Sequence, residues 1–153
     1  MPVEQLIDEV EAKVFRARDA FLEEMGQIDD LDQALHYIPN TVDSTALVMR
    51  YIDEEEIPGR KATNRLAIVN QIYLVELYCY GYDREEMQER FQRIVLRIRQ
   101  RLRTNPTLGR AIKQSFEVRR LGDPQMVLIN LGGSQQPLLR QQWRYSHQME
   151  VRG

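Results

Sequence analysis

The most regular hydrophobic pattern in the chain covers residues 66–104 and changes its period once. Residues 66–80 are an almost unbroken run of β-branched, aromatic and other apolar side chains, which is typical of a strand with both faces covered. After Gly81 the apolar positions recur every three to four residues, which predicts an amphipathic helix capped by Asp83 and ended at Asn105. The expected buried face of this helix consists of Met87, Phe91, Ile94, Val95, Ile98 and Leu102.

The N-terminal residues 3–25 show the same helical spacing, and Gly26 follows them. Residues 27–44 are rich in loop-forming residues, and an aspartate is expected to cap a short helical turn over residues 31–37. The apolar row of the N-terminal helix is Leu6, Val10, Val14, Ala17, Phe21 and Met25.

The rest of the chain predicts shorter strands separated by turn residues. In the last one, alternate side chains that include Trp143, Tyr145 and His147 form an apolar row, so His147 is expected to be a core or interface histidine rather than a metal ligand. The expected strands are residues 45–53, 112–121, 126–131 and 137–151.

This order of elements predicts an α+β fold, with a mainly antiparallel sheet covered by one long amphipathic helix, plus an N-terminal helix. The length of 153 residues fits a single hydrophobic core. We divide the chain into residues 1–44, the N-terminal helix and connector, and residues 45–153, a single compact α+β unit.

Charge is distributed unevenly along the chain. Residues 1–56 carry fifteen acidic and four basic side chains, whereas residues 57–153 carry eight acidic and seventeen basic ones, and the net charge is −2. The asymmetry suits head-to-tail packing of identical subunits, acidic surface on basic surface. Two solvated faces explain it equally well.

Two charged segments are candidate subunit or partner interfaces. The first is a hairpin arm over residues 53–64 with a turn at Pro58-Gly59, and the second is a basic stripe on the helix that follows Asp83. The arm residues are Glu54, Glu55, Glu56, Arg60 and Lys61, and the stripe residues are Arg90, Arg93, Arg97 and Arg101.

The sequence indicates no catalytic residue, cofactor site or metal site. It contains no phosphate-binding glycine loop, zinc-protease motif or nucleophile elbow, and the lone Cys79 rules out an internal disulfide. Glu76 and Glu117 could belong to a metal-dependent nuclease, but the lysine such a site needs is missing. No run of about 18 apolar residues predicts a membrane span, and no secretory leader is recognisable.

The segment from Thr45 to Val151 resembles the tail terminator (tail-to-head joining) proteins of tailed bacteriophages. A strand at Ala46-Leu47-Val48, a charged arm and a long strand containing Ile72-Tyr73-Leu74-Val75-Glu76-Leu77-Tyr78 carry this resemblance, together with the Asp83-led helix and the tryptophan-bearing last strand. The turn after the helix reads Asn105-Pro106-Thr107-Leu108-Gly109, and Arg110 stands where the family has a second glycine.

The resemblance implies a non-enzymatic virion protein of the tail or neck that is made in the host cytoplasm. It implies a homo-oligomer, a hexameric ring that caps the tail tube protein, docks on the head connector or neck protein, and lets genomic DNA pass through its lumen without sequence-specific binding. Three alternatives stay open: another neck component (a head-completion or connector adaptor protein), a small nucleic-acid-binding module that uses the arginine helix, and an enzyme.

Overall fold

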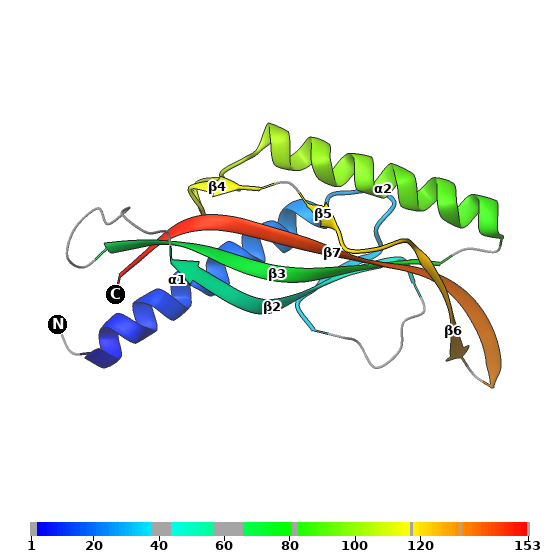
Figure 1. Ribbon diagram of the computed structural model, residues 1–153, viewed down its shortest axis with the longest axis horizontal. Helices are drawn as coiled ribbons and strands as arrows, with labels where there is room; N and C mark the ends of the chain where they lie inside the picture. Colours follow the sequence, from blue (N-terminus) through cyan, green and yellow to red (C-terminus); the bar gives the residue numbers. More distant parts are fainter. Residues whose placement is uncertain are drawn as a thin grey trace.

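The computed structural model describes residues 3–37, 44–56, 66–80, 83–116, 118–131 and 133–152. Within them it contains two helices and a seven-stranded sheet (Figure 1). The helices are α1 (Val3–Met25) and α2 (Arg84–Thr104). The strands are β1 (Gln33–Leu35), β2 (Ala46–Glu56), β3 (Leu66–Tyr80), β4 (Gln114–Ser115), β5 (Arg119–Arg120), β6 (Gln125–Leu131) and β7 (Ser134–Arg152).

The sheet is built around the antiparallel pair β3 and β7. Their ladder runs from Leu66 opposite Arg152 to Tyr80 opposite Leu138. β2 lies on the other side of β3, and β1 pairs with β2 in parallel, so the sheet is mixed. The other edge of the 19-residue β7 pairs with β4, β5 and β6 along different parts of its length. β7 therefore belongs both to the main sheet and to the hairpin that it forms with β6.

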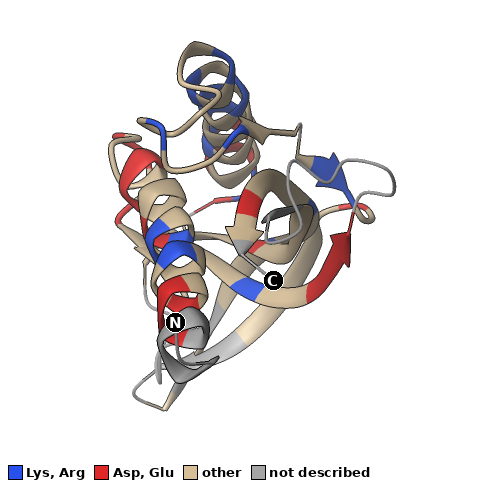
Figure 2. Ribbon diagram, turned by 90° about the vertical axis from the view of Figure 1, so that its left-hand side faces the viewer, with Lys and Arg blue, Asp and Glu red and all other residues tan. Residues whose placement is uncertain are grey.

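Both helices pack on the same face of this sheet, with the strands curving strongly and the helices on the outer side of the curve (Figures 1 and 2). The expected fold class, with one long helix covering a mainly antiparallel sheet, is therefore wrong: the sheet is mixed and α1 shares the cover with α2. Ala17, Phe21 and Met25 of α1 join the same core as Ile94 and Ile98 of α2. One helix is about 10 Å wide and strands lie about 4.8 Å apart, so α2 alone covers only about two strands.

Aromatic contacts join the helices to β7. The Phe21 ring stacks on the Tyr145 ring with centroids 4.1 Å apart, and the Arg99 guanidinium of α2 lies 5.8 Å from the Trp143 ring centroid. The alternation predicted for the last strand is confirmed, because all members of its apolar row are buried. That row is Leu139, Gln141, Trp143, Tyr145, His147, Met149 and Val151.

The two long helices and the central strand are confirmed at their expected positions. α2 begins as predicted, with the Asp83 Oδ1 atom accepting a hydrogen bond from the Glu86 backbone N–H at 2.7 Å. Its buried residues are the expected apolar positions except Val95, which is partly buried against the core. Neither described helix has an apolar stretch of the length needed to cross a membrane.

The helical turn expected over residues 31–37 is wrong, because this segment contains the parallel strand β1. The backbone N–H groups of Asp32 and Gln33 both donate to the Thr45 carbonyl, and the Asp32 carboxylate accepts from the Thr45 N–H at 3.0 Å. The aspartate thus joins two segments instead of capping a helix. A three-residue strand is too short to give a periodic signal.

The continuous strand expected over residues 112–121 is also wrong, because only β4 and β5 form there. The backbone N–H groups of Lys113, Phe116 and Leu121 donate to carbonyls of β7, so the segment follows β7 without forming an unbroken ladder. Residue 117 lies outside the described residues.

The hairpin arm can be followed only in part. β2 extends beyond its expected end at residue 53 as far as Glu56. The Pro58-Gly59 turn and the candidate residues Arg60 and Lys61 lie outside the described residues.

Replacing Phe21 by alanine removes a ring that is fully buried between α1 and β7, so we expect the free energy of unfolding to fall by about 3–5 kcal/mol. Phe15→Ala is the matched control on the same helix, because Phe15 is 43% exposed and we expect a change of about 0.5 kcal/mol. Urea denaturation of both variants measures the difference. Equal losses would contradict the packing described here.

Candidate functional site

The last four residues of β2 form an exposed acidic end. A bulge between Tyr51 and Asp53 inserts Ile52 without a partner on β3, so the side chains that follow change face. As a result Glu54 lies opposite Gln71 on the face that carries both helices. None of the four carboxylates forms an ion pair with another described residue. We call this segment the acidic end: Asp53, Glu54, Glu55 and Glu56.

The outer edge of β2 is open along most of its length. β1 pairs only with Ala46, Leu47 and Val48, and no other described strand pairs with this edge. Tyr51 and Ile52 on the open part are 56% and 51% exposed. We call β2 from Met49 to Glu56 the open edge. Unpaired backbone donors and acceptors make such an edge a place where another chain can add a strand.

A hollow of about 330 Å³ lies beside the open edge, between β2, β3 and α1. Tyr51 forms part of its wall, and burial, followed by the Glu54 and Asp53 carboxylates, raises the pKa of the Tyr51 hydroxyl. Most of the lining is aromatic or apolar, which suits an inserted side chain better than a small charged ligand. The lining residues are Val14, Phe15, Arg18, His36, Met49, Tyr51, Glu54, Gln71 and Tyr73.

Behind this hollow the sheet buries a polar cluster of Tyr73, Tyr145 and His147. The Tyr145 hydroxyl and the His147 Nδ1 atom are 3.0 Å apart, and the Tyr73 and His147 rings meet edge to face at 5.3 Å. Burial lowers the pKa of His147 to about 4 and raises the pKa of Tyr73 to about 12. The core interpretation of His147 is therefore correct, although its Nε2 atom has no hydrogen-bond partner among the described residues.

Three of the four stripe arginines on α2 contact the end of α1 or the segment that follows it. Arg90 donates to the Asp30 carbonyl at 2.9 Å, and Arg93 pairs with the Asp30 carboxylate at 3.5 Å. Arg101 pairs with Glu24 at 3.1 Å. Arg97 is exposed and donates to Gln100 within the helix, so it is the stripe residue most open to another molecule. Binding of a partner by the stripe stays a prediction.

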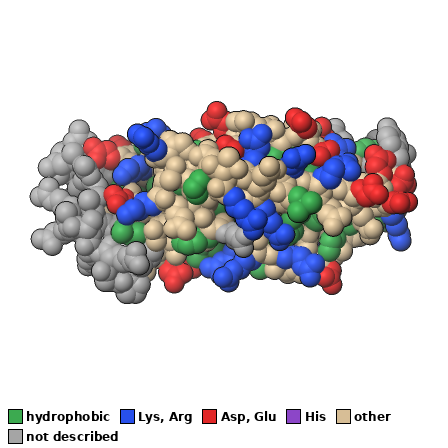
Figure 3. Space-filling model, turned by 90° about the horizontal axis from the view of Figure 1, so that it is seen from above, with side chains coloured by type: hydrophobic (Ala, Val, Ile, Leu, Met, Phe, Trp, Pro, Cys, Tyr) green, Lys and Arg blue, Asp and Glu red, His purple; other side chains and the backbone are tan. Residues whose placement is uncertain are grey.

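These contacts pair acidic side chains of the N-terminal part with basic side chains of α2, so part of the uneven charge is neutralised within the chain. Figure 3, which looks down on α2, shows a cluster of acidic side chains at one end and both basic and acidic side chains along the rest. Acids in the first turn and bases in the last turn of α2 complement the helix dipole. The acidic end of β2 is different, because its carboxylates form no ion pair with a described residue.

The remaining reactive side chains are engaged in structural contacts. On the face opposite the helices, the nearly buried Glu76 carboxylate forms an ion pair with Arg50 and accepts a hydrogen bond from the Tyr78 hydroxyl at 2.7 Å. Burial, followed by the Glu76 hydrogen bond, raises the pKa of Tyr78 to about 12. The Cys79 thiol is buried and donates to the Met87 carbonyl, and burial raises its pKa.

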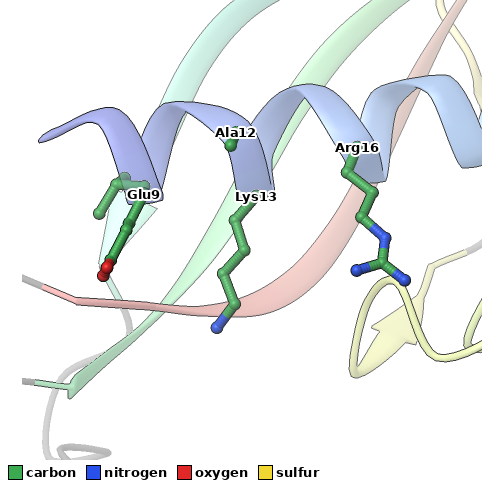
Figure 4. A pocket seen from close by; sticks show the side chains of 5 residues that line it. Glu9, Ala12, Lys13 and Arg16 are labelled. Carbon is green, nitrogen blue, oxygen red and sulfur yellow. The ribbon is translucent and has the colours of Figure 1, made fainter. Parts of the chain in front are cut away.

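A second hollow lies along α1, where Glu9, Lys13 and Arg16 extend from the same side of the helix (Figure 4). The Lys13 Nζ atom donates to the Glu150 carbonyl at 3.2 Å, which ties the helix to the end of β7. The spacing of these residues is that of neighbours along one helix face, which indicates a solvated charged face. Across the described ranges, no three His, Cys, Asp or Glu side chains come together as a metal site would require.

Sequence reasoning missed the open edge of β2 and the exposed apolar residues of β2 and β6. Tyr51 and Ile52 look like ordinary strand residues, and Leu128 of β6 is 62% exposed although it lies in an apolar run. The acidic run that follows Tyr51 was the available signal, since charges on a strand are typical of a sheet edge.

No protein-family model matches this sequence, and no curated protein matches it.

The depressed pKa of His147 predicts a loss of stability in acid. Between pH 6.5 and about 4 the unfolded chain binds a proton that the folded chain excludes, so stability falls as the pH drops through this window. The full effect is about 3 kcal/mol. We expect the difference in unfolding free energy between the wild type and His147→Gln to shrink by about this amount from pH 7.5 to pH 4. Parallel pH dependence of the two proteins would contradict the assignment.

Charge reversal at Arg101 should destabilise the fold, whereas reversal at Arg97 should not. Arg101→Glu replaces the ion pair with Glu24 by two neighbouring carboxylates, and we expect a loss of about 1 kcal/mol in unfolding free energy. Arg97→Glu makes the same charge change without a described acidic partner, and we expect less than about 0.5 kcal/mol. Thermal or urea unfolding separates the two, and a larger loss in Arg97→Glu would refute this division of the stripe.

Proposed function

We propose that this protein is a structural subunit of a tailed-phage virion that forms a ring, closes the end of the tail tube and joins the tail to the head connector. Copies of the chain form the ring through their sheet edges, and genomic DNA passes through its lumen without sequence-specific contacts. The protein functions through the surfaces that contact other copies and neighbouring virion proteins.

The open, acidic edge of β2 is the observation that carries this proposal. Four successive carboxylates lie on an edge strand that also exposes Tyr51 and Ile52. Exposed apolar side chains beside unpaired backbone groups do not stabilise a monomer, whereas a subunit interface uses both. Like charges on two identical edges repel each other, which favours contact with a different surface of the next copy.

The titratable groups found in buried positions support a structural role. Glu76 is held by Arg50 and Tyr78, and His147 contacts Tyr145 within the core. These groups lie on opposite faces of the sheet, since Glu76 and Gln71, the strand partner of His147, are an odd number of residues apart on β3. They therefore do not converge on one substrate position, as general acid–base catalysis requires.

The turn after α2 adds support from the backbone. Arg110 has a φ of 70°, a left-handed conformation that favours glycine. This is the position at which the tail terminator family, which the chain resembles, carries its second glycine. Leu108 and Gly109 before it also have positive φ angles, of 48° and 68°.

The arginine helix favours this proposal over a nucleic-acid-binding module. A phosphate-binding stripe needs side chains that are free to neutralise phosphates. Arg90, Arg93 and Arg101 already contact carbonyl or carboxylate oxygens of residues 24–32. Another neck component would share the same edge chemistry, and the position of the protein in the particle distinguishes the two.

Electron microscopy and native mass spectrometry of the purified protein test the proposal directly. We expect a closed ring with a central opening and one dominant mass, six times that of the chain, and an antibody against the protein should label the head-proximal end of isolated tails. The double variant Glu54→Lys, Glu55→Lys should weaken ring formation at least tenfold, a change of about 1.4 kcal/mol.

The matched control is Glu11→Lys, Glu23→Lys, which makes the same charge change at exposed positions of α1. A monomer at every concentration, or labelling of heads without tails, would overturn the proposed function. Equal weakening by the control would show that net charge, and not the edge of β2, controls assembly.

A further inference from the structure

We propose that β6 of one copy adds as a strand to the open edge of β2 of the next copy. This inference rests on the proposed ring function, because it assigns the two surfaces that meet between neighbouring subunits. The occupant of the open edge is thus a second copy of this chain.

The acceptor is the part of β2 that β1 leaves uncovered. Pairing with β1 ends at Val48, while pairing with β3 on the inner side continues to Glu56 opposite Val69. The backbone groups on the outer side of residues 49–56 therefore have no described strand partner. Tyr51 and the neighbouring hollow offer an apolar contact beside this edge.

The donor is β6, which is also an edge strand. It pairs with β7 from Gln125 opposite Arg140 to Leu131 opposite Ser134, and no described strand pairs with its other side. Met126 and Leu128 lie on one face of β6 and are 37% and 62% exposed. The unpaired backbone groups of β6 can form hydrogen bonds with those of the open edge of β2, and its exposed apolar side chains can pack against the apolar residues beside that edge.

Charge decides between this partner and the obvious alternative, which is a second open edge of β2. Pairing two acidic ends would bring carboxylates into opposite or neighbouring positions, which destabilises a strand pair. β6 contains no charged residue, so it pairs without this repulsion. Arg119 of β5 is exposed a few residues before β6 and supplies positive charge near its base, whereas Arg120 pairs with Asp123 at 3.5 Å.

The two edges lie at opposite ends of the molecule. The acidic end is beside the first residues of β3, and the β6–β7 hairpin extends beyond the last residues of β3 (Figure 1). Each copy can therefore donate β6 at one end and accept a strand at the other. Such a head-to-tail contact closes into a ring when the rotation between copies permits it.

A charge comparison at Leu128 tests the proposal in the full-length protein. Leu128→Glu and Leu128→Lys remove the same exposed apolar side chain and differ only in the charge they place against the acidic end. We expect the dissociation concentration, measured by analytical ultracentrifugation, to rise at least tenfold more in the Glu variant than in the Lys variant. In a Glu54→Gln, Glu55→Gln, Glu56→Gln background the gap should fall below threefold.

Equal effects of the two substitutions, or a gap that persists in the glutamine background, would overturn the proposal while leaving ring formation standing. Monomers under all conditions would overturn the proposal and the proposed function together. Circular dichroism of each variant confirms folding, and since Leu128 is exposed we expect unchanged spectra.

Cysteine cross-linking provides an independent test, because the native Cys79 is buried. A mixture of Tyr51→Cys protein and Leu128→Cys protein should form disulfide-linked dimers under mild oxidation, and the doubly substituted protein should form a ladder of linked subunits. Efficient dimers of Tyr51→Cys protein alone would show that two β2 edges pair with each other, which contradicts the proposal. Absence of mixed dimers would contradict it as well.

Discussion

Burial of one sheet face under two helices is the constraint on which the rest of the structure depends. The apolar row of β7 and the matching residues of β2 and β3 all face the helices, and neither helix is wide enough to cover them alone. α1 covers the Tyr145 region through Phe21, and α2 covers the region of Trp143 and Cys79. With the stabilising contacts concentrated on this face, the edges of the sheet are left for contacts with other molecules.

The same division applies to the charges. Glu24 accepts from Arg101 and from the Asn105 side chain, and Asp30 contacts Arg90 and Arg93, so these acids join α2 to the end of α1 and to the connector that follows it. The acidic end of β2 has no comparable described partner. An uneven charge distribution in the sequence therefore has two consequences: part of it stabilises the fold, and part of it is available at an edge. Under the proposed function, only the second part bears on assembly.

Much of the architecture could be predicted from the sequence where the periodic signal is long. α1, α2, β3 and the buried row of β7 were predictable because each extends over fifteen or more residues of regular spacing. β1 and the interrupted segment of β4 and β5 were not, because their hydrogen bonds to Thr45 and to β7 depend on tertiary position and not on local pattern. The bulge at Ile52 was likewise hidden, although it determines which face Glu54 joins.

The candidate interface was predictable only in composition. The run from Asp53 to Glu56 indicates an exposed charged segment, but whether it belongs to a loop, a paired strand or an open edge depends on how far β1 extends. The stripe on α2 illustrates the opposite case, since spacing places Arg90, Arg93, Arg97 and Arg101 on one surface without revealing that acids of the same chain lie beside them. Sequence spacing identifies side chains that are neighbours on one helix. It does not identify contacts between segments that are distant in the sequence.

We propose that copies of this chain meet through their sheet edges. Amide hydrogen exchange, measured on the same protein at a dilute and at a concentrated condition, tests it most directly. We expect residues 49–56 of β2 and 125–131 of β6 to exchange more slowly at high concentration, while β3, which is paired on both sides, does not change. Exchange that is independent of concentration in both edge segments would contradict it.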